Sequence, residues 1–154
     1  MNISFTSRLS IVVLVLITSM ASAQPSAPGD ELSWEDRTTQ TLMAKISDWA
    51  GTWQAQLPDL YIAHYALDYI APGFASRQAW LADRRQRLVE PEYIKLRLLD
   101  FELVSLTEAE AVARFTLTYE RPGYADETQK ELVFSNRGGL WLISAENNLQ
   151  VTPL

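Results

Sequence analysis

Residues 93–119 read YIKLRLLDFELVSLTEAEAVARFTLTY, and here the apolar side chains begin to recur at every second residue, which is the spacing of a strand. Up to Leu98 the apolar residues hold one parity, and from Leu99 onward they hold the other. One extra residue re-aims every later side chain of a strand, so this switch predicts a bulge or bend in one long strand. Residues 111–119 alternate again and predict a second strand with one apolar face.

The residues that follow predict two more strands. Residues 121–123, Arg-Pro-Gly, are turn-forming types, and the apolar pattern around Leu132 marks a third strand. Residues 136–139 predict a tight hairpin connection to a fourth strand, which we expect to begin at Trp141 and to end near Glu146.

The residues before this region predict three helices. Ser33 begins a capping box for the first helix, which has one apolar stripe and extends from about Trp34 to Gln56. Pro58 suits the first turn of a short second helix, and Ser76 can cap a third helix over residues 77–89. Helices that precede a run of antiparallel strands predict an α+β domain, with three N-terminal helices packed on one face of a curved antiparallel sheet.

The composition predicts one globular domain and excludes several kinds of function. The 154 residues are 47% hydrophobic and include 13 Lys plus Arg against 19 Asp plus Glu, a net charge of -6. Binding to a nucleic acid backbone needs clustered positive charge, so we expect no nucleic acid partner. With no cysteine and a single histidine, the chain cannot form a thiolate or multi-histidine metal site, and we expect neither a metal nor another cofactor.

The N-terminus has the organisation of a secretory signal peptide. A basic residue precedes a short apolar run, and Ala21-Ser22-Ala23 provides the small residues of a cleavage site, so we expect residues 1–23 to be removed. The alternative, a membrane anchor, needs about 20 apolar residues, and the run over residues 9–20 is shorter than that. We therefore expect a flexible lead over residues 24–31 and a domain over residues 32–154 that is periplasmic or secreted and makes no membrane contact.

Several short segments occur in the order found in one known family. They are residues 49–53, 61–65 (YIAHY), 76–80 (SRQAW), 91–94 (PEYI), 115–119, 130–132 (KEL) and 141–146. Together they resemble the accessory domain that lies C-terminal to the catalytic domain of some bacterial L,D-transpeptidases. That domain is similar to the nuclear transport factor 2-like superfamily, which also holds the SnoaL-type cyclases and ketosteroid isomerase. The resemblance covers about residues 34–147 and implies a cone in which helices and a bent sheet enclose a cavity.

The chain departs from that family in two respects. Leu117 stands where the strand between Phe115 and Tyr119 usually carries Gln, which argues against a polar pocket role for that position. The chain also has no cysteine, and its 154 residues leave no room for a transpeptidase domain. The resemblance therefore implies the accessory fold and not the transpeptidase reaction.

An enclosed cavity predicts a binding site, and five residues are the candidates for its lining. They are Trp80, Arg84, Arg87, Tyr119 and Glu146. The two arginines lie one turn apart on the expected third helix, where their guanidinium groups could hold a carboxylate or phosphate of a small anionic ligand. The alternative, which we favour, is that one arginine pairs with Glu146 or Asp83 and holds the helix against the sheet.

Two other groups of residues are assigned to packing. His64 could act as an acid or base, but a lone histidine on an aromatic helix face is more often packed. Trp49 and Trp53 recur at the spacing that burial of a helix requires, so we expect them in the core rather than in a sugar-stacking platform.

Two functions fit these observations. The first, which we favour, is an exported, non-enzymatic binding or accessory domain of the bacterial cell envelope, linked to peptidoglycan metabolism, whose partner is a small anionic ligand or an envelope protein. The alternative is a small cavity enzyme of the cyclase or isomerase type that uses Glu146 as a buried carboxylate base. A homodimer formed through the sheet is compatible with both.

Overall fold

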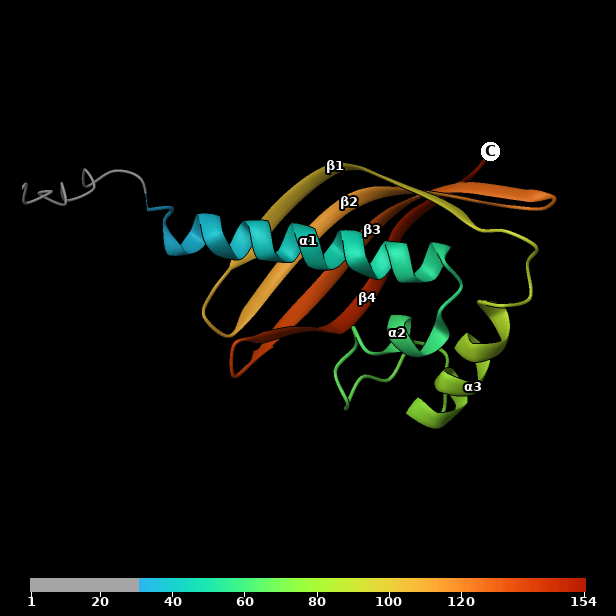
Figure 1. Ribbon diagram of the computed structural model, residues 1–154, viewed down its shortest axis with the longest axis horizontal. Coiled ribbons are helices and arrows are strands. Elements are labelled where there is room, and N and C mark those ends of the chain that lie inside the picture. Colours follow the sequence, from blue (N-terminus) through green and yellow to red (C-terminus); the bar gives the residue numbers. More distant parts are fainter. Residues whose placement is uncertain (1–30) are drawn as a thin grey trace, which may run out of the picture. The chain divides into compact units, whose positions relative to one another are not determined.

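The computed structural model describes residues 31–154, which form three helices followed by four strands (Figure 1). The elements are α1 (Trp34–Gln54), α2 (Pro58–Ile62), α3 (Arg77–Arg87), β1 (Lys95–Leu106), β2 (Glu110–Arg121), β3 (Tyr124–Arg137) and β4 (Leu140–Pro153). The predicted signal peptide, residues 1–23, lies outside the described residues, as does all but the last residue of the predicted lead. None of the helices in the described residues is long and apolar enough to cross a membrane.

The long helices form where the sequence provides a cap and one apolar face. The Ser33 hydroxyl accepts a hydrogen bond from the Asp36 amide (3.0 Å) and caps α1. Leu42, Ile46 and Trp49, which share one stripe of α1, are buried in the core. Both α1 and α3 end slightly before their predicted boundaries.

Gln56 ties the end of α1 to the end of α3. Its backbone has a positive φ of 56°, and its side-chain amide donates to the carbonyl oxygens of Leu88 (2.9 Å) and Pro91 (2.7 Å). These two bonds fix the C-terminal end of α3 against α1. They therefore help to position the α3 side chains that line the pocket described below.

The strands form an antiparallel meander in the order β1-β2-β3-β4. The register of β1 against β2 shifts between Leu99 and Glu102, and Asp100 has a positive φ of 54° there. This irregularity lies where the change of parity predicts a bulge, so that prediction is confirmed. It allows Leu98 and Leu103, which are of opposite parity, both to pack against the core.

Strand β4 is longer than the sequence indicates. We predict its end near Glu146, and this is wrong, because β4 pairs with β3 as far as Pro153. The residues after Glu146 are exposed on both faces, so burial does not impose on them the alternation that identifies a strand. Backbone pairing with residues 126–131 of β3 holds this segment in place.

All three helices lie on one face of the curved sheet, and the core lies between the two layers (Figure 1). The other face is polar and carries cross-strand ion pairs such as Arg114 with Glu131 (2.8 Å). Between α2 and α3 the chain passes the outer edge of β4, where Tyr65 forms a parallel bridge with Ile143. The predicted α+β fold, with three N-terminal helices on a curved antiparallel sheet, is confirmed.

Candidate ligand-binding pocket

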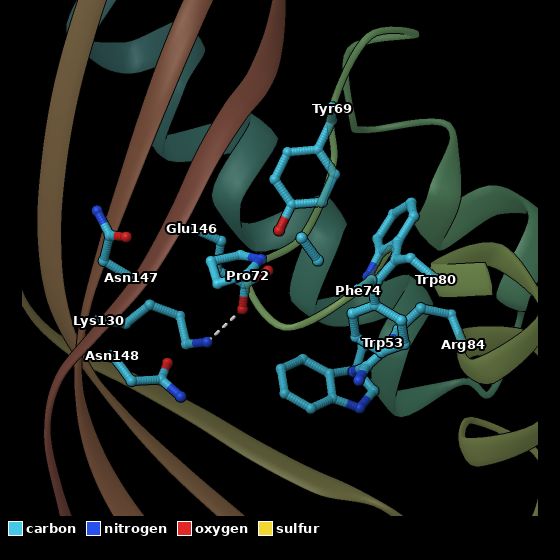
Figure 2. Close-up of a pocket in the computed structure, with 11 residues that line it drawn as sticks. Trp53, Tyr69, Pro72, Phe74, Trp80, Arg84, Lys130, Glu146, Asn147 and Asn148 are labelled. Carbon is cyan, nitrogen blue, oxygen red and sulfur yellow. Dashed lines mark hydrogen bonds and ion pairs between the residues drawn. The ribbon is translucent and has the colours of Figure 1, made fainter. Parts of the chain in front are cut away.

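A pocket of about 510 Å³ opens between the helices and strands β3 and β4, and we call it the Trp80 pocket (Figure 2). Its walls come from Trp53 on α1, four residues of the segment 69–74, Trp80 and Arg84 on α3, Lys130 on β3, and residues 146–148 on β4. Aromatic rings and a cation therefore come from the helical side, and an ion pair and the Asn148 amide come from the sheet.

A chain of buried hydrogen bonds ends at Glu146. Its Oε1 accepts from Lys130 Nζ, and its Oε2 accepts from the Tyr65 hydroxyl (2.6 Å). The Tyr65 oxygen also accepts from Trp49 Nε1 (3.0 Å) and lies 2.6 Å from the Tyr61 hydroxyl. An ionised carboxylate can only accept, so Tyr65 must donate to Glu146, and Tyr61 must then donate to Tyr65. Both carboxylate oxygens are thus occupied by groups of the protein itself.

The surroundings keep Glu146 in its anionic form. Burial by itself raises the pKa of the Glu146 carboxyl, but the Lys130 ammonium, the Tyr65 hydroxyl and the Arg84 charge outweigh it, and the net result is a lowered pKa. Burial and the charge of Glu146 raise the pKa of Tyr65 well above its ordinary value, so Tyr65 stays a donor. Lys130 and Glu146 therefore form an internally neutral pair.

Lys130 is placed by the register of the sheet and by two indole rings. It faces the helices, since it occupies the same parity of β3 as the buried Leu132, and only 4% of its side chain is exposed. Its Nζ lies 5.8 Å from the ring centroid of Trp49 and 5.9 Å from that of Trp53, within the range of a cation–π interaction. A lysine at an apolar position of a strand was the sequence signal for this site, and our sequence analysis did not use it.

Arg84 is the second cation of the pocket and is less completely paired. Its Nη2 lies 3.0 Å from Asp83 Oδ2, and a quarter of its side chain is exposed. Its Nε is buried, and no hydrogen-bond partner for it exists among residues 31–154. Arg87 also pairs with Asp83 (2.7 Å). Since Asp83 belongs to the same helix, neither ion pair holds α3 against the sheet, and Glu146 pairs with Lys130 instead.

The five predicted site residues fall into two places. Trp80, Arg84 and Glu146 line the Trp80 pocket. Arg87 and Tyr119 line a separate depression of about 170 Å³. Arg87 lies near the end of α3, where Leu88 caps the helix, and this places it in the smaller depression.

The residues assigned to packing also divide. Trp49 is fully buried in the core, whereas Trp53 is half-buried and forms part of the pocket wall. His64 lies outside the pocket lining, with Nε2 3.9 Å from Asp48 Oδ2, and its burial lowers its pKa. The segment 69–74 is a part of the lining that the sequence does not predict, because nothing in its local pattern indicates that it faces β4.

Comparison with known sequences identifies a family. The family model described as the Cds6 C-terminal NTF2-like domain matches residues 41–147. No curated protein matches the chain significantly.

Solved structures share the fold. Bd1075 of Bdellovibrio bacteriovorus is 22% identical with a TM-score of 0.66, and the match covers 80% of this chain and 44% of Bd1075. The helical cell shape determining protein Pgp2 of Campylobacter jejuni, as its K307A mutant, is 16% identical with a TM-score of 0.64, covering 75% of this chain and 41% of Pgp2. A putative scytalone dehydratase of Novosphingobium aromaticivorans is 14% identical with a TM-score of 0.60, and the match covers 77% of this chain and 88% of that protein. The chain thus spans less than half the length of Bd1075 and of Pgp2.

Proposed function

Because this chain belongs to the family of Cds6 C-terminal NTF2-like domains, we propose that it is an exported, non-enzymatic binding domain of the bacterial cell envelope, whose Trp80 pocket holds a peptidoglycan-derived ligand. The observation that carries the proposal is the uneven pairing of charges in a pocket of about 510 Å³. Lys130 already neutralises Glu146, whereas Arg84 keeps a buried N–H with no partner in the described part of the chain. Such a pocket favours an anionic ligand.

The state of Glu146 supports binding over catalysis. A general base needs a free lone pair directed at the substrate and a pKa near the working pH. Both oxygens of Glu146 accept hydrogen bonds within the protein, and its pKa is lowered away from neutrality. The carboxylate is therefore suited to holding Lys130 and Tyr65 in place and poorly suited to removing a proton.

The remaining lining suits a fragment of peptidoglycan. Trp53 is half-buried and offers an aromatic face on which a sugar ring or an apolar side chain can pack, whereas Trp80 is buried within the pocket wall. Arg84 can form charge-assisted hydrogen bonds with a carboxylate, and the side-chain amide of Asn148 can exchange hydrogen bonds with peptide groups. Peptidoglycan fragments combine these chemical groups in one small molecule.

Two observations support a location in the envelope. The first 23 residues have the organisation of a signal peptide. The fold is shared with Pgp2, which is named as a determinant of helical cell shape, and the shape of a bacterial cell is set by its wall. The whole activity of Pgp2 is not transferred, since the match covers 41% of that protein.

The test is a calorimetric titration of the purified protein with soluble muropeptides released from peptidoglycan by a muramidase. Arg84→Gln should weaken binding by about tenfold or more, equivalent to about 1.4 kcal/mol, because a charge-assisted bond is lost. Arg85→Gln is the matched control: Arg85 is the next residue of α3 and pairs with Asp59 (3.0 Å) outside the pocket. No binding, or binding that does not depend on Arg84, would contradict the proposal.

The enzyme alternative is tested with the same preparations. A small cavity enzyme that uses Glu146 should turn over a substrate, and Glu146→Gln should abolish that turnover. Turnover that survives Arg84→Gln and is lost in Glu146→Gln would replace the binding proposal with the enzymatic one.

A further inference from the structure

The outer edge of β4 is only partly occupied. β4 is the last strand of the sheet, and the segment 64–66 runs parallel to the beginning of this edge. There the Ile143 amide donates to the His64 carbonyl (2.9 Å), and the Ala66 amide donates to the Ile143 carbonyl (2.9 Å). The chain then turns at residues 67–68, and the segment 69–74 continues along the Trp80 pocket without pairing with the backbone of β4. Among residues 31–154, the backbone groups of residues 144–153 pair with β3 alone.

The part of this edge that none of residues 31–154 covers carries no charge, and it contains a bulge at Leu149 and a proline, Pro153, at its end. Residues 147–154 read NNLQVTPL, carry no charged side chain, and are all exposed. The opposite edge, β1, carries Lys95, Arg97 and Glu102 and is interrupted by the bulge at Asp100. Charges and bulges are the usual means by which natural edge strands avoid pairing. Both edges contain bulges, so the absence of charged side chains after Glu146 is what makes β4 the more open of the two to an additional strand.

The Trp80 pocket opens along the same stretch of β4. Asn147 and Asn148 contribute to it from the strand, and the segment 69–74 faces them across the opening (Figure 2). Glu146 and Asn148 face the helices, as their partners Leu132 and Lys130 do. Alternate side chains of a strand added beside β4 would point in the same direction, toward the pocket. Such a side chain would meet Arg84, whose Nε lacks a partner within the described residues.

We propose that the free edge of β4 binds an extended peptide as an additional strand alongside residues 145–151, with an acidic side chain of that peptide in the Trp80 pocket near Arg84. This inference rests on the proposed function, because it specifies how the ligand of that pocket is held. Main-chain hydrogen bonds along β4 then provide affinity, and the pocket selects one side chain.

A second copy of the chain is a poorer occupant of the edge. Pairing of β4 with β4 of another copy would place residues 147–154 of that copy, NNLQVTPL, beside the pocket. Residues 147–154 contain no acidic side chain that could reach Arg84. An acidic peptide can form main-chain hydrogen bonds with the edge of β4 and also place a carboxylate near Arg84.

The probe is acetyl-TVTETVT-amide, whose Glu lies on the same face as its two Val side chains, together with the analogue in which Gln replaces this Glu. With isotope-labelled protein, the Glu peptide should shift the amide resonances of residues 145–151 and slow their hydrogen exchange. The Glu peptide should bind about tenfold more tightly than the Gln peptide, a preference typical of one charge-assisted contact. In Arg84→Gln, the two peptides should both still bind, with equal affinity. The control Arg85→Gln should still bind the Glu peptide more tightly than the Gln peptide.

A proline on the edge tests the strand itself. Consecutive residues of a strand direct their N–H groups to opposite edges, so only one of Gln150→Pro and Val151→Pro removes a bond to β3. The other removes a free N–H, keeps the wild-type melting temperature, and should lose peptide binding. If both proline variants are destabilised, hydrogen exchange of the wild-type protein is the deciding measurement. Slower exchange of residues 145–151 with the Glu peptide supports the added strand, and unchanged exchange contradicts it.

The possible results separate this inference from the proposed function. Peptide binding without protection of residues 145–151, or full binding by the stable proline variant, would overturn the added strand while leaving the muropeptide result intact. A concentration-dependent dimer that the stable proline variant dissociates would overturn it as well and assign the edge to a second copy. Peptide binding as expected, together with no muropeptide binding, would retain the strand and refute the peptidoglycan ligand.

Discussion

Lys130 is the residue on which the charge distribution of the pocket depends. It is nearly inaccessible, and its ammonium lies between the Glu146 carboxylate and the indole rings of Trp49 and Trp53. A lone buried charge is very unfavourable, whereas a buried pair that is fully hydrogen-bonded is tolerated. The Lys130 ammonium therefore helps to lower the pKa of Glu146 and to keep its carboxyl group ionised. Arg84 remains as the cation available to a ligand.

Removing one member of this pair should cost more than removing both. Lys130→Met leaves the Glu146 carboxylate buried with one hydrogen bond fewer, and we expect it to lower the free energy of unfolding by about 3–5 kcal/mol. Lys130→Met combined with Glu146→Leu should recover much of this loss, because no charge is then left unpaired. Chemical denaturation of the three proteins measures both values, and additive losses in the double variant would contradict the expectation.

The same experiment repeated at several pH values provides a second readout. The pKa of Glu146 is lower in the folded protein than the ordinary value of 4.5, because Lys130, Tyr65 and Arg84 outweigh burial. A carboxyl group with a lowered pKa stabilises the fold above its unfolded pKa, and this contribution is lost as the pH falls through the folded pKa. Wild-type stability should therefore fall below about pH 4.5, and the double variant should fall less steeply.

At the scale of elements, the position of α3 depends on the end of α1. Gln56 leaves the helix with a positive φ and donates to two carbonyl groups at the end of α3. The chain thus accepts an unfavourable backbone conformation at the point where it gains contacts between two helices. Trp80 and Arg84 are carried by the helix that these contacts fix.

Two substitutions of Gln56 separate the backbone from the side chain. Gln56→Ala removes both hydrogen bonds and retains the positive φ, so we expect a loss of about 1–3 kcal/mol in the free energy of unfolding. Gln56→Gly removes the same bonds but adopts a positive φ freely, and should be more stable than Gln56→Ala by about 1 kcal/mol. Thermal melts test this order, and a glycine variant less stable than the alanine variant would refute it.

At the scale of the whole molecule, the proposed location depends on the first 23 residues. Their single charged side chain is Arg8, so the mature chain would have 12 basic residues (13 minus 1) against 19 acidic ones, a net charge of -7. A net charge of this size makes molecules of the chain repel one another in water.

Export predicts a defined N-terminus. Intact-mass spectrometry of the protein from its native host should find a chain that begins at Gln24, in the periplasmic or secreted fraction. Ala23→Leu, which replaces a small residue of the cleavage pattern, should retain the leader and serve as the control. A mature protein that begins at Met1 in the cytoplasm would contradict the prediction.

The fold could be predicted further than the site, and the reason lies in the range of the interactions. The local spacing of apolar residues is sufficient to predict α1, α3 and the bulge of β1, because burial of one face of an element requires apolar residues at regular intervals. It is insufficient for residues 147–153 of β4, which are exposed on both faces and are held by pairing with β3. The structure brings Trp80, Arg84 and Glu146 into one pocket, since helix and strand patterns direct them inward.

Lys130 shows what local patterns cannot provide. Its neighbours on the same face of β3, Leu132 and Phe134, predict a buried position, where a lysine needs a partner. That partner, Glu146, is supplied by the register between β3 and β4, which depends on contacts distant in sequence. Contacts distant in sequence also decide which side chains share a pocket. Arg87 and Tyr119 are therefore predicted to line a pocket that neither of them lines.

The two tryptophans in the pocket wall make the protein its own optical reporter. Of the five tryptophans, Trp53 and Trp80 line the pocket, and Trp49 lies behind it beside the Lys130 ammonium. The emission of an indole depends on the polarity and the charges around it, and a bound molecule would displace water from these rings and change the field at Arg84. Occupancy of the pocket is therefore readable as a change in intrinsic fluorescence, and ligand collections can be screened on the unlabelled protein.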